Sequence, residues 1–155
     1  MKKKIYILAG ICLLVDQISK FLAHLFLNNV VIIPNFFSLT YVENTGAAWG
    51  IFDNNRIILV CVSVIALLVI SKYLKTEDNI SKLSMTSYGI LIGGIFGNLL
   101  DRMFRGYVID FLNFNIFGYN FPVFNIADIL IVIGVLLMAL EVVGVSVHGI
   151  NCKKK

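Results

Sequence analysis

Four long apolar stretches, separated by more polar segments, dominate the pattern of the chain. They cover residues 5–27, 57–73, 83–103 and 126–147. A helix needs roughly 20 apolar residues, within a range of about 17 to 25, to cross the hydrocarbon core of a bilayer. The pattern therefore predicts four transmembrane helices.

Two longer connecting segments, residues 28–56 and 104–125, lie between the first and second and between the third and fourth of these stretches. Phe36–Val42 alternates well enough to predict a short strand. The second segment is rich in aromatic residues, whose spacing is closer to that of a strand than of a helix, so we expect an irregular or hairpin element at the membrane surface. The predicted fold class is an all-α polytopic membrane protein with a small extracytoplasmic β or irregular segment.

The first apolar stretch also has features of a secretory signal peptide. It follows three lysines and contains a run, Leu8–Cys12, that is similar to a lipoprotein cleavage box. Such a box needs a small residue directly before the cysteine, but Ile11 occupies that position, and the apolar stretch continues well beyond it. We therefore expect an uncleaved transmembrane helix.

Composition agrees with a membrane protein and excludes two other classes. Of the 155 residues, 59% are hydrophobic and only 14% are charged, and the mean hydropathy is +0.89. Soluble domains carry about 25% charged residues, and disordered chains require low hydrophobicity. The three cysteines, Cys12, Cys61 and Cys152, are far apart and predict neither a disulfide framework nor a zinc site.

The net charge of +4 arises largely from lysines beside the apolar stretches, which indicates membrane topology and not nucleic-acid binding. Four spans place both chain ends and the 72–82 loop on one side. Nine lysines lie on that side: Lys2, Lys3, Lys4, Lys72, Lys75, Lys82, Lys153, Lys154 and Lys155. The positive-inside rule then places both termini in the cytoplasm and the two connecting segments outside.

The first span carries Asp16 and Lys20 four residues apart, on one face of the predicted helix. A charge at the centre of a membrane helix costs about 2.5–3.5 kcal/mol on insertion scales, so the two are best tolerated as a pair. The spacing leaves open whether the pair only orients the helix or also serves a site. His24 lies near the end of the span, and we expect no catalytic role for it.

The third span combines a packing motif with a polar end. Three glycines fall every four residues and predict a flat ridge for close helix packing: Gly89, Gly93 and Gly97. Asn98, Asp101 and Arg102 follow on one face at the helix end, and packing alone does not explain them.

Two aspartates are the best candidates for chemistry. Asp110 interrupts an apolar surface segment and Asp128 opens the fourth span, whereas motifs for serine, cysteine and metal-dependent hydrolases and for phosphate loops are absent from the sequence. Two close carboxylates can share a proton, so that one acts as acid and the other as base toward a water molecule. Asn125 and Asp128 also fit a simple helix N-cap, which would explain both without chemistry.

Five sequence blocks resemble one known family, the bacterial lipoprotein signal peptidases, or signal peptidase II, which are membrane aspartic peptidases. In order along the chain, the blocks are Asp16-x-x-x-Lys20, Asn44–Trp49, Gly93–Arg102, Val108–Phe111 and Phe124–Asp128. Each block is short, but their order on a four-span chain makes the resemblance specific. One mild departure is Ile109, where the family commonly has valine.

The resemblance implies a single membrane-embedded peptidase domain over residues 1–155 and a role for each matched residue. Asp110 and Asp128 would be the catalytic dyad. The residues that would bind substrate or inhibitor, or shape the site, are Asn44, Gly46, Ala47, Asn98, Arg102 and Asn125. Asp16, Lys20 and Asp101 would support the site structurally, and no metal or other cofactor is expected.

The resemblance also implies a substrate and a location. Family members remove the signal peptide of prolipoproteins by cutting before a diacylglyceryl-modified cysteine, and cyclic peptides of the globomycin type inhibit them. We accordingly expect a monomer in the bacterial cytoplasmic (inner) membrane, in contact with membrane lipids, with its active site at the outer face and no nucleic-acid partner.

The sequence is also compatible with two other classes of membrane protein. A small ion or proton-coupled transporter subunit could use Asp16, Lys20, Asp101 and Arg102 as an ion path, although no inverted repeat is visible in the sequence. A structural membrane scaffold would leave Asp110 unexplained.

Overall fold

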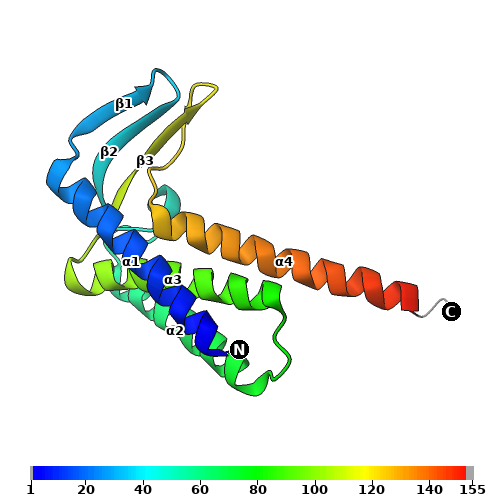
Figure 1. Ribbon diagram of the computed structural model, residues 1–155. Coiled ribbons are helices and arrows are strands. Elements are labelled where there is room, and N and C mark those ends of the chain that lie inside the picture. Colours follow the sequence, from blue (N-terminus) through cyan, green and yellow to red (C-terminus); the bar gives the residue numbers. More distant parts are fainter. Residues whose placement is uncertain (1, 153–155) are drawn as a thin grey trace.

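The computed structural model describes the backbone of residues 2–152 and the side chains of residues 2–144. Lys153, Lys154 and Lys155, which contributed to the topology prediction, lie outside the described residues. The elements follow one another as α1 (Lys2–Phe26), β1 (Asn29–Ile33), β2 (Phe37–Asn44), the short 3-10 helix η1 (Ala48–Gly50), α2 (Arg56–Thr76), α3 (Lys82–Phe104), β3 (Val108–Ile116), β4 (Tyr119–Asn120) and α4 (Ile126–Cys152) (Figure 1).

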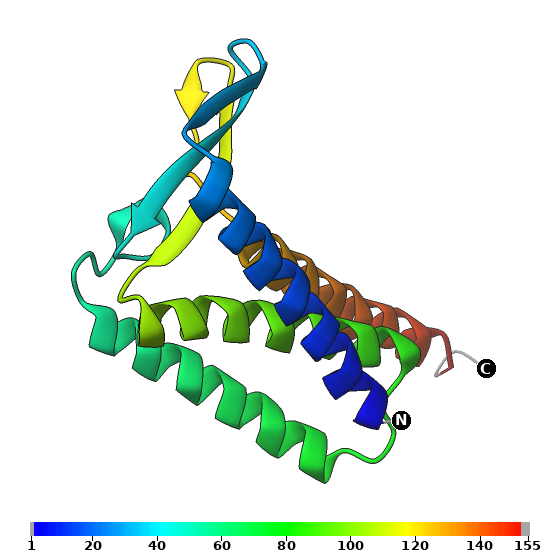
Figure 2. The same ribbon diagram turned by 60° about the vertical axis from the view of Figure 1, so that its left-hand side comes forward.

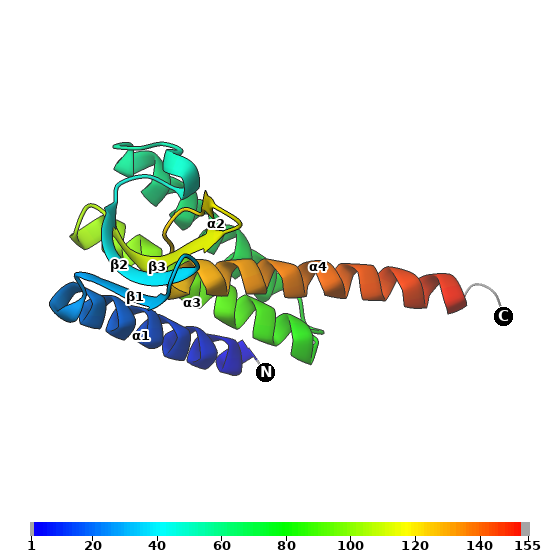
Figure 3. The same ribbon diagram turned by 90° about the horizontal axis from the view of Figure 1, so that it is seen from above.

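The four predicted transmembrane helices are confirmed. Within the described residues, four helices are long and apolar enough to cross a membrane, and each begins and ends within a few residues of the predicted limits, except that α4 continues to Cys152. The core of the bundle is α3, which packs against the other three helices (Figures 1 and 2). Half of the residues in the most apolar part of α3 are buried, against 11% in α4, whose far end extends away from the other helices (Figure 3).

The predicted glycine ridge lies against α1. A Cβ added to Gly89 would lie 2.8 Å from a Leu8 side-chain carbon, and one added to Gly93 would lie 2.5 Å from the Cβ of Cys12. A Cβ on Gly97 would collide with the carboxylate of Asp16. The ridge therefore brings the backbones of α1 and α3 close together and sets the distance of Asp16 from α3.

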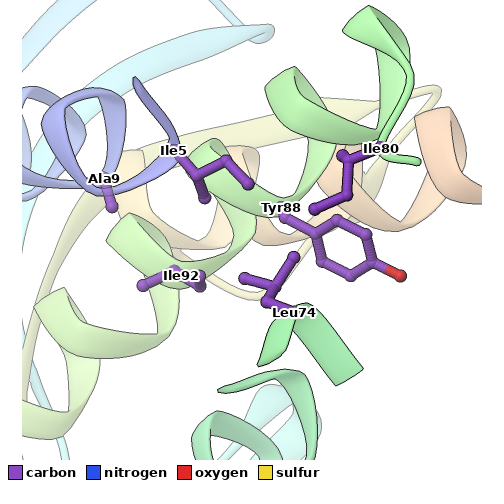
Figure 4. Close-up of a cluster of buried hydrophobic side chains, with 6 residues drawn as sticks. All are labelled: Ile5, Ala9, Leu74, Ile80, Tyr88 and Ile92. Atoms are coloured by element: carbon purple, nitrogen blue, oxygen red, sulfur yellow. The ribbon is translucent and has the colours of Figure 1, made fainter. Parts of the chain in front are cut away.

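An apolar cluster closes the end of the bundle where the chain begins. Its buried side chains come from α1, from the end of α2, from the α2–α3 connection and from α3: Ile5, Ala9, Leu74, Ile80, Tyr88 and Ile92 (Figure 4). An ion pair of 3.6 Å between Lys2 and Asp78 joins the start of the chain to the α2–α3 connection. The start of α1 and this connection thus lie at the same end of the molecule.

A four-stranded antiparallel sheet stands at the opposite end, in the order β1-β2-β3-β4 (Figure 2). The predicted strand over Phe36–Val42 is confirmed as β2, and the aromatic segment forms the expected hairpin from β3 and β4. The strand β1 was not predicted. Its four consecutive apolar residues occupy both faces of the strand and are all exposed, so it lacks the alternation that normally reveals a strand.

Candidate active site

Asp110 and Asp128 both line one cavity of about 620 Å³ at the junction of the sheet and the bundle. Asp110 is the third residue of β3, and Asp128 lies in the first turn of α4. The antiparallel pairing of β3 with β2 places Val42 opposite Asp110 and Asn44 opposite Val108. Residues far apart in the sequence therefore meet because the end of β2, the start of β3 and the start of α4 converge.

Asp110 is held by two asparagine amides. The Nδ2 atom of Asn44 donates to one carboxylate oxygen at 2.7 Å, and the Nδ2 atom of Asn125 donates to the other at 2.6 Å. The residue is only 2% exposed. Burial, and to a smaller extent the nearby charge of Asp128, raises the pKa of Asp110 to about 7, although the hydrogen bonds from Asn44 and Asn125 oppose that rise.

Asp128 is also bonded through both of its oxygens. The Nδ2 atom of Asn98 donates to Oδ1 at 2.8 Å, and the backbone N–H of Asn125 donates to Oδ2 at 3.2 Å. In return, Oδ1 of Asn125 accepts from the backbone N–H of Asp128 at 3.0 Å. This reciprocal pair is a capping box, so the predicted N-cap is confirmed.

Asn125 joins the two aspartates as well as capping α4. Its Nδ2 atom donates to Asp110 and also lies 3.2 Å from Oδ1 of Asn98. The residue is fully buried and does not line the cavity. The interpretation as a cap and the interpretation as a site residue therefore do not exclude one another, because different atoms of the same side chain serve each contact.

Behind Asn98, the predicted Asp16–Lys20 pair is confirmed at 2.9 Å. The Lys20 ammonium also lies 2.9 Å from the carboxylate of Asp101 and donates to Oδ1 of Asn98 at 2.8 Å. The side chains of Lys20, Asp16 and Asp101 are fully buried. The other oxygen of Asp16 accepts from the backbone N–H of Ala127, beside Asp128, at 2.8 Å. Local spacing predicted the pair but not these contacts to α3 and α4.

The segment after β2 forms one wall of the cavity. Oδ1 of Asn44 accepts from the backbone N–H of Gly46 at 2.9 Å, and Arg102 donates to the Gly46 carbonyl at 2.8 Å. Arg102 and Ala47 line the cavity, whereas Gly46 does not. A Cβ on Gly46 would meet the backbone of the following turn at 3.2 Å. Trp49, which has a left-handed backbone (φ 56°), donates to the hydroxyl of Tyr119 at 3.2 Å.

The rest of the cavity lining is largely apolar and comes from α2, α4 and the segment before α4. The lining residues of the two helices beyond Asp128 are Leu59, Val62, Ser63, Ile129, Ile131, Val132 and Ile133. The second span carries no charged candidate residue that would indicate a part in the site. Its apolar sequence therefore does not reveal that Leu59, Val62 and Ser63 face the cavity.

Within the described part of the chain, no group of three or more histidine, cysteine, aspartate or glutamate side chains is placed to hold a metal ion. The arrangement instead offers two close carboxylates, one with a pKa near neutrality, beside an apolar cavity. Such a pair is suited to general acid–base chemistry on a water molecule.

Comparisons with known proteins point to one family. The family described as signal peptidase (SPase) II matches residues 8–144. A lipoprotein signal peptidase from Symbiobacterium thermophilum is 40% identical over 146 residues, which cover 92% of this chain and 96% of that protein.

Two solved structures of bacterial membrane enzymes have the same fold. The first, determined by the in meso method at 2.3 Å resolution, is 30% identical, has a TM-score of 0.82 and covers 89% of this chain and 86% of its own. The second, determined by the same method at 1.9 Å, is 31% identical, has a TM-score of 0.78 and covers 88% and 90%. Together with the family match over most of the chain, these similarities show that this multi-pass membrane protein belongs to the signal peptidase II family.

Proposed function

We propose that the chain is an aspartic endopeptidase that removes the signal peptide of prolipoproteins by cutting before a diacylglyceryl-modified cysteine. One observation carries the proposal: Asp110 and Asp128 line the same cavity, and a single buried residue, Asn125, donates to both carboxylates, from its side chain to Asp110 and from its backbone N–H to Asp128. The raised pKa of Asp110, to about 7, supports a dyad that holds one proton at neutral pH.

In the proposed mechanism Asp110 holds this proton and Asp128 is the base. Asp128 takes a proton from a water molecule while the water oxygen attacks the carbonyl carbon of the scissile amide, and Asp110 protonates the carbonyl oxygen. The resulting diol returns a proton to Asp110 as it collapses. The C–N bond breaks, and the proton on Asp128 passes to the leaving nitrogen. The dyad ends with the single proton with which it began.

The surrounding residues would hold this pair and the substrate in place. Asn44, Asn98 and Asn125 fix the carboxylates. Arg102 would bind a substrate carbonyl, because its buried Nε–H has no hydrogen-bond partner among the described residues. Ala47, with the tight turn at Gly46 behind it, would favour small substrate residues before the cysteine. Asp16, Lys20 and Asp101 would support the site from α1 and α3, as proposed from the sequence.

The apolar part of the cavity is suited to a lipid-modified substrate. Cavity residues of α2 and α4, such as Val62 and Val132, would contact acyl chains or the apolar signal peptide, with membrane lipids alongside. A globomycin-type cyclic peptide would compete for the same space. The lysine-rich ends support cytoplasmic termini in the bacterial inner membrane, with the sheet and the cavity at the outer face. We propose that the protein acts as a monomer, as the family resemblance implies.

Purified full-length protein in detergent, given a prolipoprotein with and without the diacylglyceryl group, tests the proposal. We expect cleavage directly before the modified cysteine, measured by product mass, and little cleavage of the unmodified form. A chelator should leave the rate unchanged. No cleavage of the modified substrate, or activity that chelation removes and zinc restores, would overturn the proposal.

A further inference from the structure

Three asparagines present their amide NH2 groups to the two aspartates, and each has its carbonyl oxygen fixed by another donor. The oxygen of Asn44 accepts from the backbone N–H of Gly46, and that of Asn125 accepts from the backbone N–H of Asp128. In both cases the donor belongs to the main chain. An amide whose oxygen is held in this way must turn its NH2 group toward the carboxylate.

The third asparagine, Asn98, has its oxygen fixed mainly by a side chain. The Lys20 ammonium donates to this oxygen at 2.8 Å, while the second donor, Asn125, is more distant at 3.2 Å. An ammonium group only donates and an ionised carboxylate only accepts, so Asn98 has one orientation that satisfies both Lys20 and Asp128. We infer that Lys20 is a positioning residue that sets the orientation of the Asn98 amide, so that Asn98 donates to Asp128.

The environment of Lys20 makes this role specific to its charge. Its ammonium lies between the carboxylates of Asp16 and Asp101, both at 2.9 Å. Without the ammonium, these two acceptors attract the NH2 group of Asn98. The amide then turns its oxygen toward Asp128, where it faces another acceptor and disfavours the ionised carboxylate. This role is more than structural support, because Lys20 determines which end of the Asn98 amide faces the proposed base, Asp128.

The inference rests on the proposed function, and its test keeps the two separable. Lys20→Met alone would leave the buried carboxylates of Asp16 and Asp101 without the positive charge that pairs with both, which is expected to destabilise the fold. We therefore compare Asp16→Asn with the double variant Asp16→Asn, Lys20→Met, in which one positive and one negative charge are removed together. Arg105→Gln is the matched control, because Arg105 pairs with Asp101 in the same cluster and, in the described part of the chain, forms no hydrogen bond with Asn98.

The measurement is steady-state cleavage of the diacylglyceryl-modified prolipoprotein across pH, with thermal stability followed in parallel. We expect the double variant to lose about 100-fold in kcat relative to Asp16→Asn, as is typical when a reacting group is misplaced, with KM nearly unchanged. We also expect the acidic limb of the pH profile to move to higher pH. Arg105→Gln should keep the parent profile whatever its stability.

A double-mutant cycle with Asn98→Ala gives the decisive comparison. If Lys20 acts through Asn98, removing Lys20 in the Asp16→Asn, Asn98→Ala background should cost no further kcat. An equal loss in both backgrounds, or activity that only follows stability with an unchanged pH profile, would overturn the inference. If the parent chain itself does not cleave the substrate, it is the proposed function that fails.

Discussion

At the scale of single residues, Asp110 and Asp128 receive the same number of donors in different settings. Each carboxylate oxygen of the pair accepts one hydrogen bond. Asp110 lies in a strand, whereas Asp128 lies in the first turn of a helix, where the macrodipole favours negative charge. This difference supports the assignment of the shared proton to Asp110 and of the base to Asp128.

The raised pKa of Asp110 predicts a pH dependence of stability. Its pKa is about 7 in the folded protein and about 4 in an unfolded chain. Its contribution is therefore fully present below pH about 4 and is lost as the pH rises through about 7, by a few kcal/mol at about 1.4 kcal/mol per pKa unit. Asp110→Asn should remove this slope, measured as unfolding in detergent between pH 4 and pH 8.

Asp78→Asn provides the control for this experiment, because the Asp78 side chain is 93% exposed in the loop at the other end of the bundle. It should retain the slope of the parent protein. An Asp110→Asn variant whose stability falls with rising pH as steeply as the parent would contradict the assignment.

At the scale of the helices, the contact between α1 and α3 depends on Gly93. A Cβ there would lie 2.8 Å from the carbonyl oxygen of Ala9 as well as 2.5 Å from Cys12, so Gly93→Ala must push the helices apart. We expect a loss of about 1–3 kcal/mol of stability, as for other overpacked cores. Thermal unfolding in detergent measures it.

Gly10→Ala is the matched control on the neighbouring helix, because a Cβ at that position would meet nothing within 4 Å. Its stability should be unchanged or slightly raised, since alanine favours a helix over glycine by up to about 1 kcal/mol. Equal effects of the two substitutions would show that helix propensity, and not close packing, governs the ridge.

The helix α2 should affect cleavage through the residues that it contributes to the cavity. Val62 lines the cavity and Val69 does not, although the two valines are similarly exposed, at 56% and 62%. Val62→Trp should fill the apolar part and lower kcat/KM by at least about tenfold, with a normal fold. Val69→Trp should leave kcat/KM unchanged, and an equal loss in both variants would place the lipid-modified substrate elsewhere.

At the scale of the whole molecule, the proposed topology places the sheet outside the cell and the α2–α3 connection inside. Phe117 and Asp78 are highly exposed at these two ends. Each would be replaced by cysteine in a chain without Cys12, Cys61 and Cys152. A membrane-impermeant maleimide should label Phe117→Cys in intact cells and Asp78→Cys only after lysis; the reverse pattern would contradict the proposed topology.

The sequence predicted features that depend on spacing within one element. The Asp16–Lys20 pair, the glycine ridge and the cap of α4 each follow from helical periodicity, and the structure contains all three. Hydrophobic runs of sufficient length likewise predicted the four spans.

Features that depend on how elements pack together could not be predicted in the same way. The contact of Lys20 with Asn98 and that of Arg102 with Gly46 join segments separated by 78 and 56 residues. The cavity-facing side of α2 was hidden because lipid and an apolar cavity select the same side chains. The strand β1 was missed for a related reason, since its residues are apolar on both faces.

The assignment of Asp110 and Asp128 as the catalytic pair is central to the proposed function. Its most direct test is the rate at which purified Asp110→Asn and Asp128→Asn variants cleave a diacylglyceryl-modified prolipoprotein, compared with Asp78→Asn. Each amide keeps the shape of the carboxylate but cannot take part in proton transfer as an acid or a base. We predict loss of detectable turnover in both variants with the fold retained, and parent activity in Asp78→Asn. Near-parent turnover by either folded variant would contradict the dyad.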